Sequence, residues 1–280
     1  MKKISIAIPL LLAAQCIHCQ ETRAPLSARY TGIGAYSKDF TDAFSGTINQ
    51  AALAGVKQAT AGVYGERRFM LAELSNYAAA IALPSRLGGF GVALNYFGGE
   101  SFNTSQIGLG YGKKLGDKVD IGVQFNYNMI KLQGYGSSST INFEAGTLLH
   151  LTDKIHIGIH VYNPVGGKFG KASNEKLASI YTTAIGYEAS GKLFMSSEIS
   201  KEEDQPVNIN AGMQYIFADR FFVRLGVATA TGNYFFGLGV QWKTFRLDAA
   251  TGWQSQLGLT PAIMLLFNFH ENDQQPEIEK

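Results

Sequence analysis

Two histidines four residues apart are the side chains of this sequence best suited to bind a metal ion or transfer a proton. His156 and His160 lie on one predicted strand and point to the same face. A strand rises about 3.3 Å per residue, so the two lie about 13 Å apart, too far for one ion. Glu144, His150 or Asp248 would complete a proton-handling site. We interpret these residues as structural and predict no metal and no cofactor.

The sequence lacks the motifs of the common catalytic classes. It contains no Gly-x-Ser-x-Gly elbow and no phosphate-binding loop. Barrel hydrolases place a serine and a histidine towards lipid, whereas His156 and His160 point inward, so we predict no catalytic residue and no enzyme. The net charge of +2 comes without a basic cluster, which argues against nucleic-acid binding.

The elements that position these side chains follow from a period of two. In residues 118–129 every odd position is apolar and every even position is polar or glycine. Such alternation indicates a strand with a different solvent on each face. Segments of about ten residues repeat it between turn residues, which is typical of an outer-membrane barrel. The predicted fold is all-β, a transmembrane antiparallel up-and-down β-barrel in a Gram-negative outer membrane.

The barrel is predicted to span residues 57–269 with about fourteen strands, an even number as in bacterial single-chain barrels. Tight turns alternate along the chain with longer loops, of which 163–176 is the longest and is rich in glycine and lysine. Short turns lie in the periplasm and longer loops outside, so both termini are predicted to be periplasmic. We expect strands near 57–66, 76–84, 89–98, 104–113, 118–130, 139–150, 154–162, 177–188, 192–200, 206–216, 220–229, 232–242, 244–253 and 259–269.

The two faces of these strands differ in polarity. The outward face is apolar, and a lysine or arginine at its middle would cost about 2–4 kcal/mol in the bilayer. Buried charges need partners, so we expect the inward ones to pair across the lumen. The main inward polar residues are Asp120, Glu144, His156, His160, Arg224, Arg246 and Asp248. Inward glycines recur as well; they either admit another backbone segment or ease strand coiling, and we favour the first explanation.

The segments outside the barrel differ in composition from it. Residues 1–19 carry a basic start and an apolar run of signal-peptide length, too short to span a bilayer. Residues 20–56 lack the alternation and are predicted to form a hatch, a plug inside the lumen. Residues 270–280 form a polar tail that we expect in the periplasm.

The N-terminal segment resembles the start of the FadL-like barrels of Bacteroidota, the PorV/PorQ group. The resemblance lies in 27–36, in Asp42-Ala43 and in 49–54, where that group has an Arg-x-x-Gly-x-Gly-x-Ala stretch, an Asp-containing helix and an Asn-Pro-Ala-x-Leu turn. The chain departs from the group at Gln50, where the group has proline. The resemblance implies a hatch built on Arg29, Gly32, Gly34, Asp42, Asn49 and Leu53.

The resemblance implies two functions. Our main interpretation is an accessory subunit of a type IX-like secretion or protein-assembly machine, because short, polar outer loops suit docking better than capture of a greasy ligand. Its partners are outer-membrane lipid and other outer-membrane or periplasmic proteins. The alternative is a FadL-like transporter of hydrophobic small molecules. The predicted partner contact is the smooth wall at Ala178, Ile180, Thr182 and Ala184, or its other face at Ser179, Tyr181 and Thr183.

Overall fold

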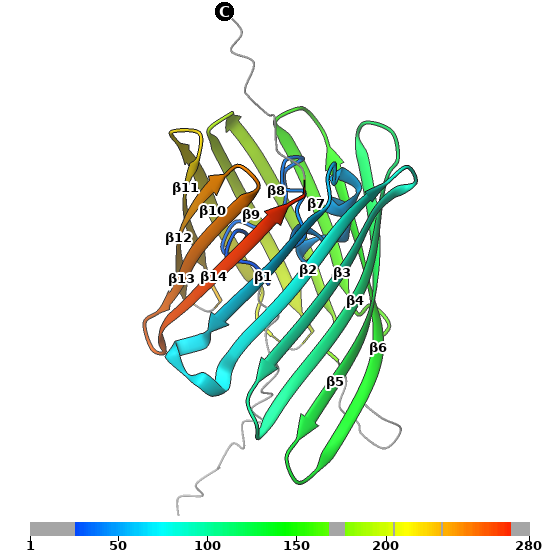
Figure 1. Cartoon of the computed structure of the whole chain (residues 1–280), viewed down its shortest axis with the longest axis vertical. Coiled ribbons are helices and arrows are strands. Elements are labelled where there is room, and N and C mark those ends of the chain that lie inside the picture. The colour runs from blue at the N-terminus through cyan, green and yellow to red at the C-terminus, as the bar shows by residue number, and fades with distance from the viewer. Residues whose placement is uncertain (1–25, 168–176, 204, 231, 270–280) are drawn as a thin grey trace, which may run out of the picture.

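The computed structural model of this chain describes residues 26–167, 177–203, 205–230 and 232–269. Over these residues the chain forms a closed barrel of fourteen antiparallel strands, and each strand pairs with its neighbours in sequence (Figure 1). The first strand closes the barrel against the last, which confirms the predicted fold. The expected signal peptide at 1–19 and the tail at 270–280 lie outside the described residues.

The observed strands agree with the predicted ones to within a few residues at each end. They are β1 (Thr60–Arg67), β2 (Ser75–Ser85), β3 (Gly88–Gly98), β4 (Phe102–Lys114), β5 (Val119–Leu132), β6 (Gly136–His150), β7 (Ile155–Tyr162), β8 (Ile180–Ser190), β9 (Leu193–Glu202), β10 (Asn208–Phe217), β11 (Phe221–Ala228), β12 (Asn233–Trp242), β13 (Phe245–Gln254) and β14 (Gly258–Asn268). Short helices are α1 (Ser45–Ile48), η1 (Gln50–Gly55), η2 (Arg68–Met70) and η3 (Ala72–Leu74). None of the helices in the described residues has the length and apolar content needed to cross a membrane.

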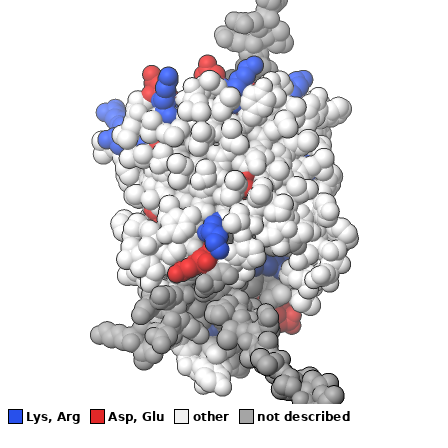
Figure 2. Space-filling view, turned by 180° about the vertical axis from the view of Figure 1, so that it is seen from behind, with Lys and Arg blue, Asp and Glu red and all other residues white. Residues whose placement is uncertain are grey.

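The alternation in sequence becomes an alternation of burial along each strand. In β5, Asp120 and Gln124 are buried, whereas Val123 and Phe125 are exposed on the outside. The outer surface is therefore apolar, and in Figure 2 the charged side chains gather mainly at one rim, above a broad band that is nearly free of them. Lipid is the solvent that suits such a band.

The hydrogen-bonded ladder is continuous around the wall. Its one shift of register lies between β8 and β9, at Glu188 and Ser190, next to a tight turn. Closure leaves no free edge along the paired stretches, and this satisfies their backbone hydrogen-bonding groups within the sheet. At the loop end β6 extends beyond β7, which pairs with it only over Glu144–His150.

The two ends of the barrel are built differently. At the turn end, uppermost in Figure 1, the hairpins are tight, β1 begins and β14 finishes. At the loop end the connections are longer. Two of the tight hairpins use left-handed residues, with φ of 50° at Ala218, 59° at Asp219 and 49° at Lys243. Such a backbone reverses direction within two or three residues, which keeps the turn end short.

Residues 26–56 lie inside the barrel, and we call this segment the hatch. Figure 1 shows it as the blue segment within the half of the barrel nearest the turn end. It contains only α1 and η1 and is otherwise irregular, yet Tyr30, Tyr36 and Phe44 are fully buried. Its apolar side chains pack against inward residues of the wall such as Met264 and Leu266. The core of the protein is therefore the contact between the hatch and the wall.

Candidate functional site: the hatch and its contacts with the wall

The backbone of the hatch packs directly against inward glycines of the wall, which we call the glycine track. A Cβ built on Gly122 would lie 2.2 Å from the carbonyl carbon of Gln50, and one on Gly186 would lie 2.0 Å from the oxygen of Tyr36. One on Gly212 would lie 2.3 Å from the oxygen of Gly32. No side chain fits at these distances, so the wall admits the hatch because these positions lack one. Close approach of a second backbone thus accounts for the glycines better than strand coiling.

Arg29, Asp42 and Tyr30 hold the hatch in its own fold. Arg29 Nη1 donates to Asp42 Oδ2 at 2.5 Å and the Tyr30 hydroxyl donates to the same oxygen at 2.7 Å. The other oxygen, Asp42 Oδ1, accepts from the backbone of Phe44 and Ser45 at the start of α1. The carboxylate thus joins Arg29 and Tyr30 to the residues at the start of α1.

Burial and charge shift the pKa values of these hatch groups. Burial lowers the pKa of Arg29, but the neighbouring Tyr30, Asp42 and Asp248 and the hydrogen bond to Asp42 together raise it by more, so the net shift is upward. Burial raises the pKa of Tyr30 well above its usual range, and Asp42 adds to that rise. Both side chains therefore keep their protons, and the arginine keeps its charge, wherever the hatch is docked.

Arg224, Arg246 and Asp248 connect the hatch to the wall on its other side. Arg224 Nη1 donates to the backbone oxygen of Arg29 at 3.0 Å, and its Nη2 bonds Asp248. Arg246 binds the same carboxylate through two nitrogens, at 2.7 and 3.1 Å. All three are buried, and the two positive charges share one negative partner. The backbone carbonyl of Arg29 therefore supplies a hydrogen-bond acceptor that the single carboxylate cannot provide for both arginines.

A second group forms around Glu144, which is fully buried. Gln50 Nε2 of the hatch donates to Glu144 Oε2 at 2.6 Å, and His160 Nε2 lies 3.0 Å from the same oxygen. Asn126 Nδ2 donates to Oε1 at 2.7 Å. Gln50 is the residue that departs from the PorV/PorQ group, and its side chain ties the hatch to the wall. A proline would make no such bond.

Asn49 and Leu53 fix the last part of the hatch. Asn49 Nδ2 donates to the backbone oxygens of Thr147 and Ile159, both at 3.2 Å. Its Oδ1 accepts from Ala51 N at 3.0 Å, which caps η1. Leu53 lies against the strand glycines of β3 and β4. Gly32 and Gly34, with φ of 78° and 63°, form the bend near the other end of the hatch.

The two predicted inward histidines do not meet. His160 pairs with Glu144, whereas His156 meets His150, with their Nδ1 atoms 2.9 Å apart. Asp248 instead binds Arg224 and Arg246 and has no contact of this kind with His156 or His160. Among the described residues no group of three or more His, Cys, Asp or Glu side chains is arranged to hold a metal ion.

Reasoning from sequence missed several side chains that bind the hatch. Tyr36 donates its hydroxyl to Glu198, and Ser37 Oγ donates to Glu188 Oε1 at 2.6 Å. Burial raises the pKa of Tyr36 well above its usual range, and Glu198 raises it further. Both glutamates occupy inward positions of β8 and β9, so the alternation was the signal that could have identified them.

Of the two faces predicted for the partner contact, one lies inside the barrel and the other on the outer wall. Thr182 and Ala184 are buried inside the barrel, across from His160 and Gly158 of β7. Tyr181 and Thr183, which belong to the alternative face, are exposed. A shift of one residue moves a whole strand face to the other side. Small residues of mixed polarity left that choice open in the sequence, and the face on which we relied is the inner one.

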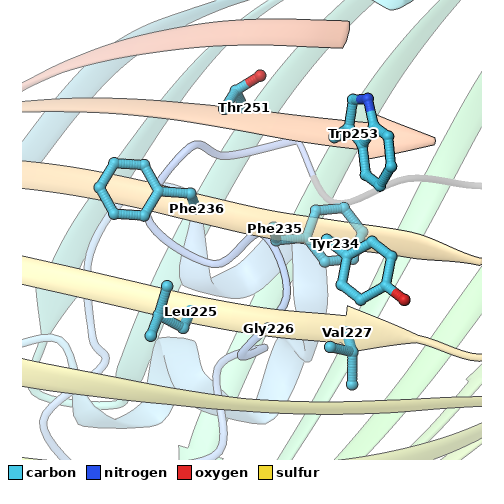
Figure 3. A pocket seen from close by; sticks show the side chains of 8 residues that line it. All are labelled: Leu225, Gly226, Val227, Tyr234, Phe235, Phe236, Thr251 and Trp253. Carbon is cyan, nitrogen blue, oxygen red and sulfur yellow. The ribbon is translucent and has the colours of Figure 1, made fainter. Parts of the chain in front are cut away.

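An apolar groove lies on the outer wall where β11, β12 and β13 pass each other (Figure 3). Its volume is about 320 Å³. The rings of Tyr234 and Trp253 stack at its edge with centroids 5.7 Å apart. Behind it, inside the barrel, Gly226 lies against Gly32 of the hatch. The lining residues are Leu225, Gly226, Val227, Tyr234, Phe235, Phe236, Thr251 and Trp253.

Comparison with known proteins identifies a fold. No protein-family model and no curated protein matches this sequence. Among solved structures, the toluene transporter TbuX of Ralstonia pickettii matches with a TM-score of 0.65 at 12% identity, covering 89% of this chain and 98% of that one. The monoaromatic hydrocarbon channel CymD matches with 0.63 at 13% identity, covering 89% and 98%. The toluene transporter TodX of P. putida matches with 0.62 at 11%, covering 86% and 99%. The chain therefore shares the fold of FadL-like outer-membrane channels.

Proposed function

We propose that this barrel is a channel by which small hydrophobic molecules enter through the outer membrane, and that the hatch is its closure. The observation that carries the proposal is a lumen filled by a segment held through hydrogen bonds and packing, within a fold shared with hydrocarbon channels. The described contacts between hatch and wall are non-covalent, so the closure is reversible. In this proposal the turn end faces the periplasm and the loop end faces outside.

Apolar side chains at the loop end support this function. Met70, Leu71, Tyr135, Val165 and Leu257 lie in four different loop-end connections, and each is at least half exposed. Apolar groups in water attract apolar solutes. The sequence suggested polar outer loops, but these exposed residues give the mouth an apolar border. Such a border suits capture of a hydrophobic solute.

The accessory-subunit hypothesis gains less support. TbuX and CymD are named as a toluene transporter and a hydrocarbon channel, and the small-residue face chosen for docking lies inside the barrel. The outer face of β8 instead presents Tyr181 and Ile185, which do not make a smooth surface. We therefore prefer the transport function.

The test is uptake of a radiolabelled monoaromatic hydrocarbon by cells that lack their own hydrocarbon channel and express this chain. The matched control locks the hatch: Ser27 Oγ lies 3.1 Å from Met264 Sδ, so the thiols of the pair Ser27→Cys and Met264→Cys can be joined by a short bis-methanethiosulfonate cross-linker between hatch and wall. We expect uptake with the original chain, loss of uptake in the cross-linked variant and recovery on reduction. Equal uptake with and without the chain, together with its co-purification in a secretion complex, would favour the accessory subunit.

A further inference from the structure

The six tight hairpins at the turn end are rich in lysine and arginine, and we call them the turn-end rim. They connect β2 to β3, β4 to β5, β6 to β7, β8 to β9, β10 to β11 and β12 to β13. With the adjoining strand ends they carry eight exposed basic side chains and three exposed acidic ones, which gather along the upper edge of Figure 2. The basic residues are Arg86, Lys113, Lys114, Lys118, Lys154, Lys192, Arg220 and Lys243, and the acidic ones are Asp117, Asp153 and Asp219.

The loop end does not share this excess of positive charge. Its described residues expose three basic and three acidic side chains, namely Arg67, Lys131, Lys201, Glu73, Glu100 and Glu203. At the rim, two of the three carboxylates are already paired: Asp219 lies 3.6 Å from Lys192, and Asp153 lies 3.3 Å from Lys38 of the hatch. The carboxylates of the rim are therefore too few to balance its cations.

Exposed apolar side chains stand next to these cations. Four hairpins place the two kinds side by side in the sequence: Arg86-Leu87, Lys114-Leu115, Arg220-Phe221 and Trp242-Lys243. All four apolar side chains are more than half exposed, and Leu87 at 71% and Trp242 at 70% are the most exposed of them. An apolar group beside a cation suits a membrane interface, because the apolar group enters the acyl region while the cation stays among the headgroups.

The positive charge is densest where the first two hairpins meet. The Tyr111 hydroxyl donates to the backbone oxygen of Leu87 at 2.6 Å, which joins the β2–β3 hairpin to β4. Lys113 pairs in register with Ile121 on the outer face of β5, so its stem lies at the edge of the apolar band and its ammonium group reaches the headgroup level. We call the four exposed basic side chains of these two hairpins the basic corner: Arg86, Lys113, Lys114 and Lys118.

The distribution of these residues favours lipid over a protein as the partner. The six hairpins follow one another around a closed barrel, so basic side chains occur on every side of it. The rim is also continuous with the apolar outer band that meets the acyl chains. A protein partner would need a patch on one side, whereas a lipid leaflet surrounds the whole barrel.

We propose that the turn-end rim binds the headgroups of anionic phospholipids, and that the basic corner is its strongest site. Arg86 offers a guanidinium that can hold a phosphate through two parallel hydrogen bonds, and the three lysines add point charges. Leu87 and Leu115 hold the two hairpins at the interface, next to those headgroups. The rim thereby fixes the depth of the turn end in the leaflet that surrounds it.

Quenching of tryptophan fluorescence by brominated lipid measures which lipid lies beside the rim. The reporter is Leu115→Trp in the basic corner, and Trp242→Phe with Trp253→Phe removes the two natural tryptophans. Vesicles mix phosphatidylglycerol with phosphatidylcholine, one of them brominated, and the quenching gives the binding constant of the first relative to the second. One basic residue near an anionic surface contributes about fivefold, so we expect a preference for phosphatidylglycerol of about fivefold or more in ~0.1 M salt. The preference should approach one in ~1 M salt, where screening acts within about 3 Å.

Removal of charge tests the residues themselves. Replacing all four side chains of the basic corner by glutamine should bring the relative binding constant close to one. The matched control Arg67→Gln with Lys131→Gln removes exposed basic side chains at the loop end and should leave it unchanged. Trp253 is the natural reporter at the loop end, and in Trp242→Phe it should show a relative binding constant close to one.

Three results would each overturn the proposal: a value near one at Leu115→Trp, an equal preference at Trp253, or an unchanged preference in the glutamine variant. Loss of an acidic protein from the purified glutamine variant, without a change in lipid preference, would assign the rim to a protein partner instead. None of these measurements involves hydrocarbon uptake, so failure of the transport function is a separate outcome.

Discussion

A methyl group placed on the glycine track should expel the hatch from the wall. In Gly122→Ala the new Cβ would lie 2.2 Å from the carbonyl carbon of Gln50, whereas ordinary contacts begin at 3.4 Å. The hatch must retreat by 3.4 − 2.2 = 1.2 Å. Overpacking of this kind costs about 1–3 kcal/mol. The retreat also stretches the hydrogen bond from Gln50 to Glu144, and losing a bond to a charged group costs about 1.5–3 kcal/mol.

The two costs together amount to about 2.5–6 kcal/mol, which is about two to four orders of magnitude in the docking equilibrium. The rate of cleavage by chymotrypsin measures this equilibrium, because its target residues Tyr30, Tyr36 and Phe44 are buried while the hatch is docked. We expect fast cleavage within the hatch and a rise in planar-bilayer conductance, with the barrel still heat-modifiable on gels.

Gly252→Ala is the matched control for this prediction. Gly252 lies in the same wall, but its Cβ would find its nearest atoms at 3.4–3.8 Å, which is ordinary contact. Its cleavage rate and conductance should stay close to those of the original chain. If Gly122→Ala does not fold, Gly212→Ala tests the same contact against the oxygen of Gly32. Identical behaviour of test and control variants would refute the close approach of hatch and wall.

Three further predictions concern charge and lipid. Burial raises the pKa values of Tyr30 and Tyr36 in the docked hatch, so above about pH 10 only the undocked phenols ionise. Docking is therefore unaffected below about pH 10 and weakens as pH rises further, and conductance should rise over the same range. Asp248→Asn leaves two buried arginines without their carboxylate and should lower the unfolding free energy in urea by about 3–5 kcal/mol. Adding Arg246→Met should recover part of that loss, and an unchanged unfolding free energy in Asp248→Asn would mean that the triad contributes nothing to stability. Leu225→Arg puts a charge on the apolar outer face and should destabilise the folded barrel in lipid vesicles by about 2–4 kcal/mol; an unchanged stability would mean that this face does not meet the bilayer.

The sequence predicted the barrel well because two solvents imprint a period of two on every strand. It predicted which residues point inward wherever polar and apolar residues alternate strictly, as in β5. It did not separate the two faces at Thr182 and Ala184, because Thr183 on the other face is equally small and polar. Contacts of the hatch were beyond its reach, because an irregular segment has no period that relates Ser37 to Glu188, 151 positions away.

The connection between hatch and wall has a consequence for what release means. Only residues 57–59 separate the end of the hatch from Thr60, where β1 begins. A released hatch therefore stays tethered to its own binding site, at an effective concentration that is in the millimolar range for short flexible linkers. Rebinding is then intramolecular and does not depend on protein concentration. A synthetic peptide with the sequence of the hatch would have to reach similar concentrations before it could compete for the lumen.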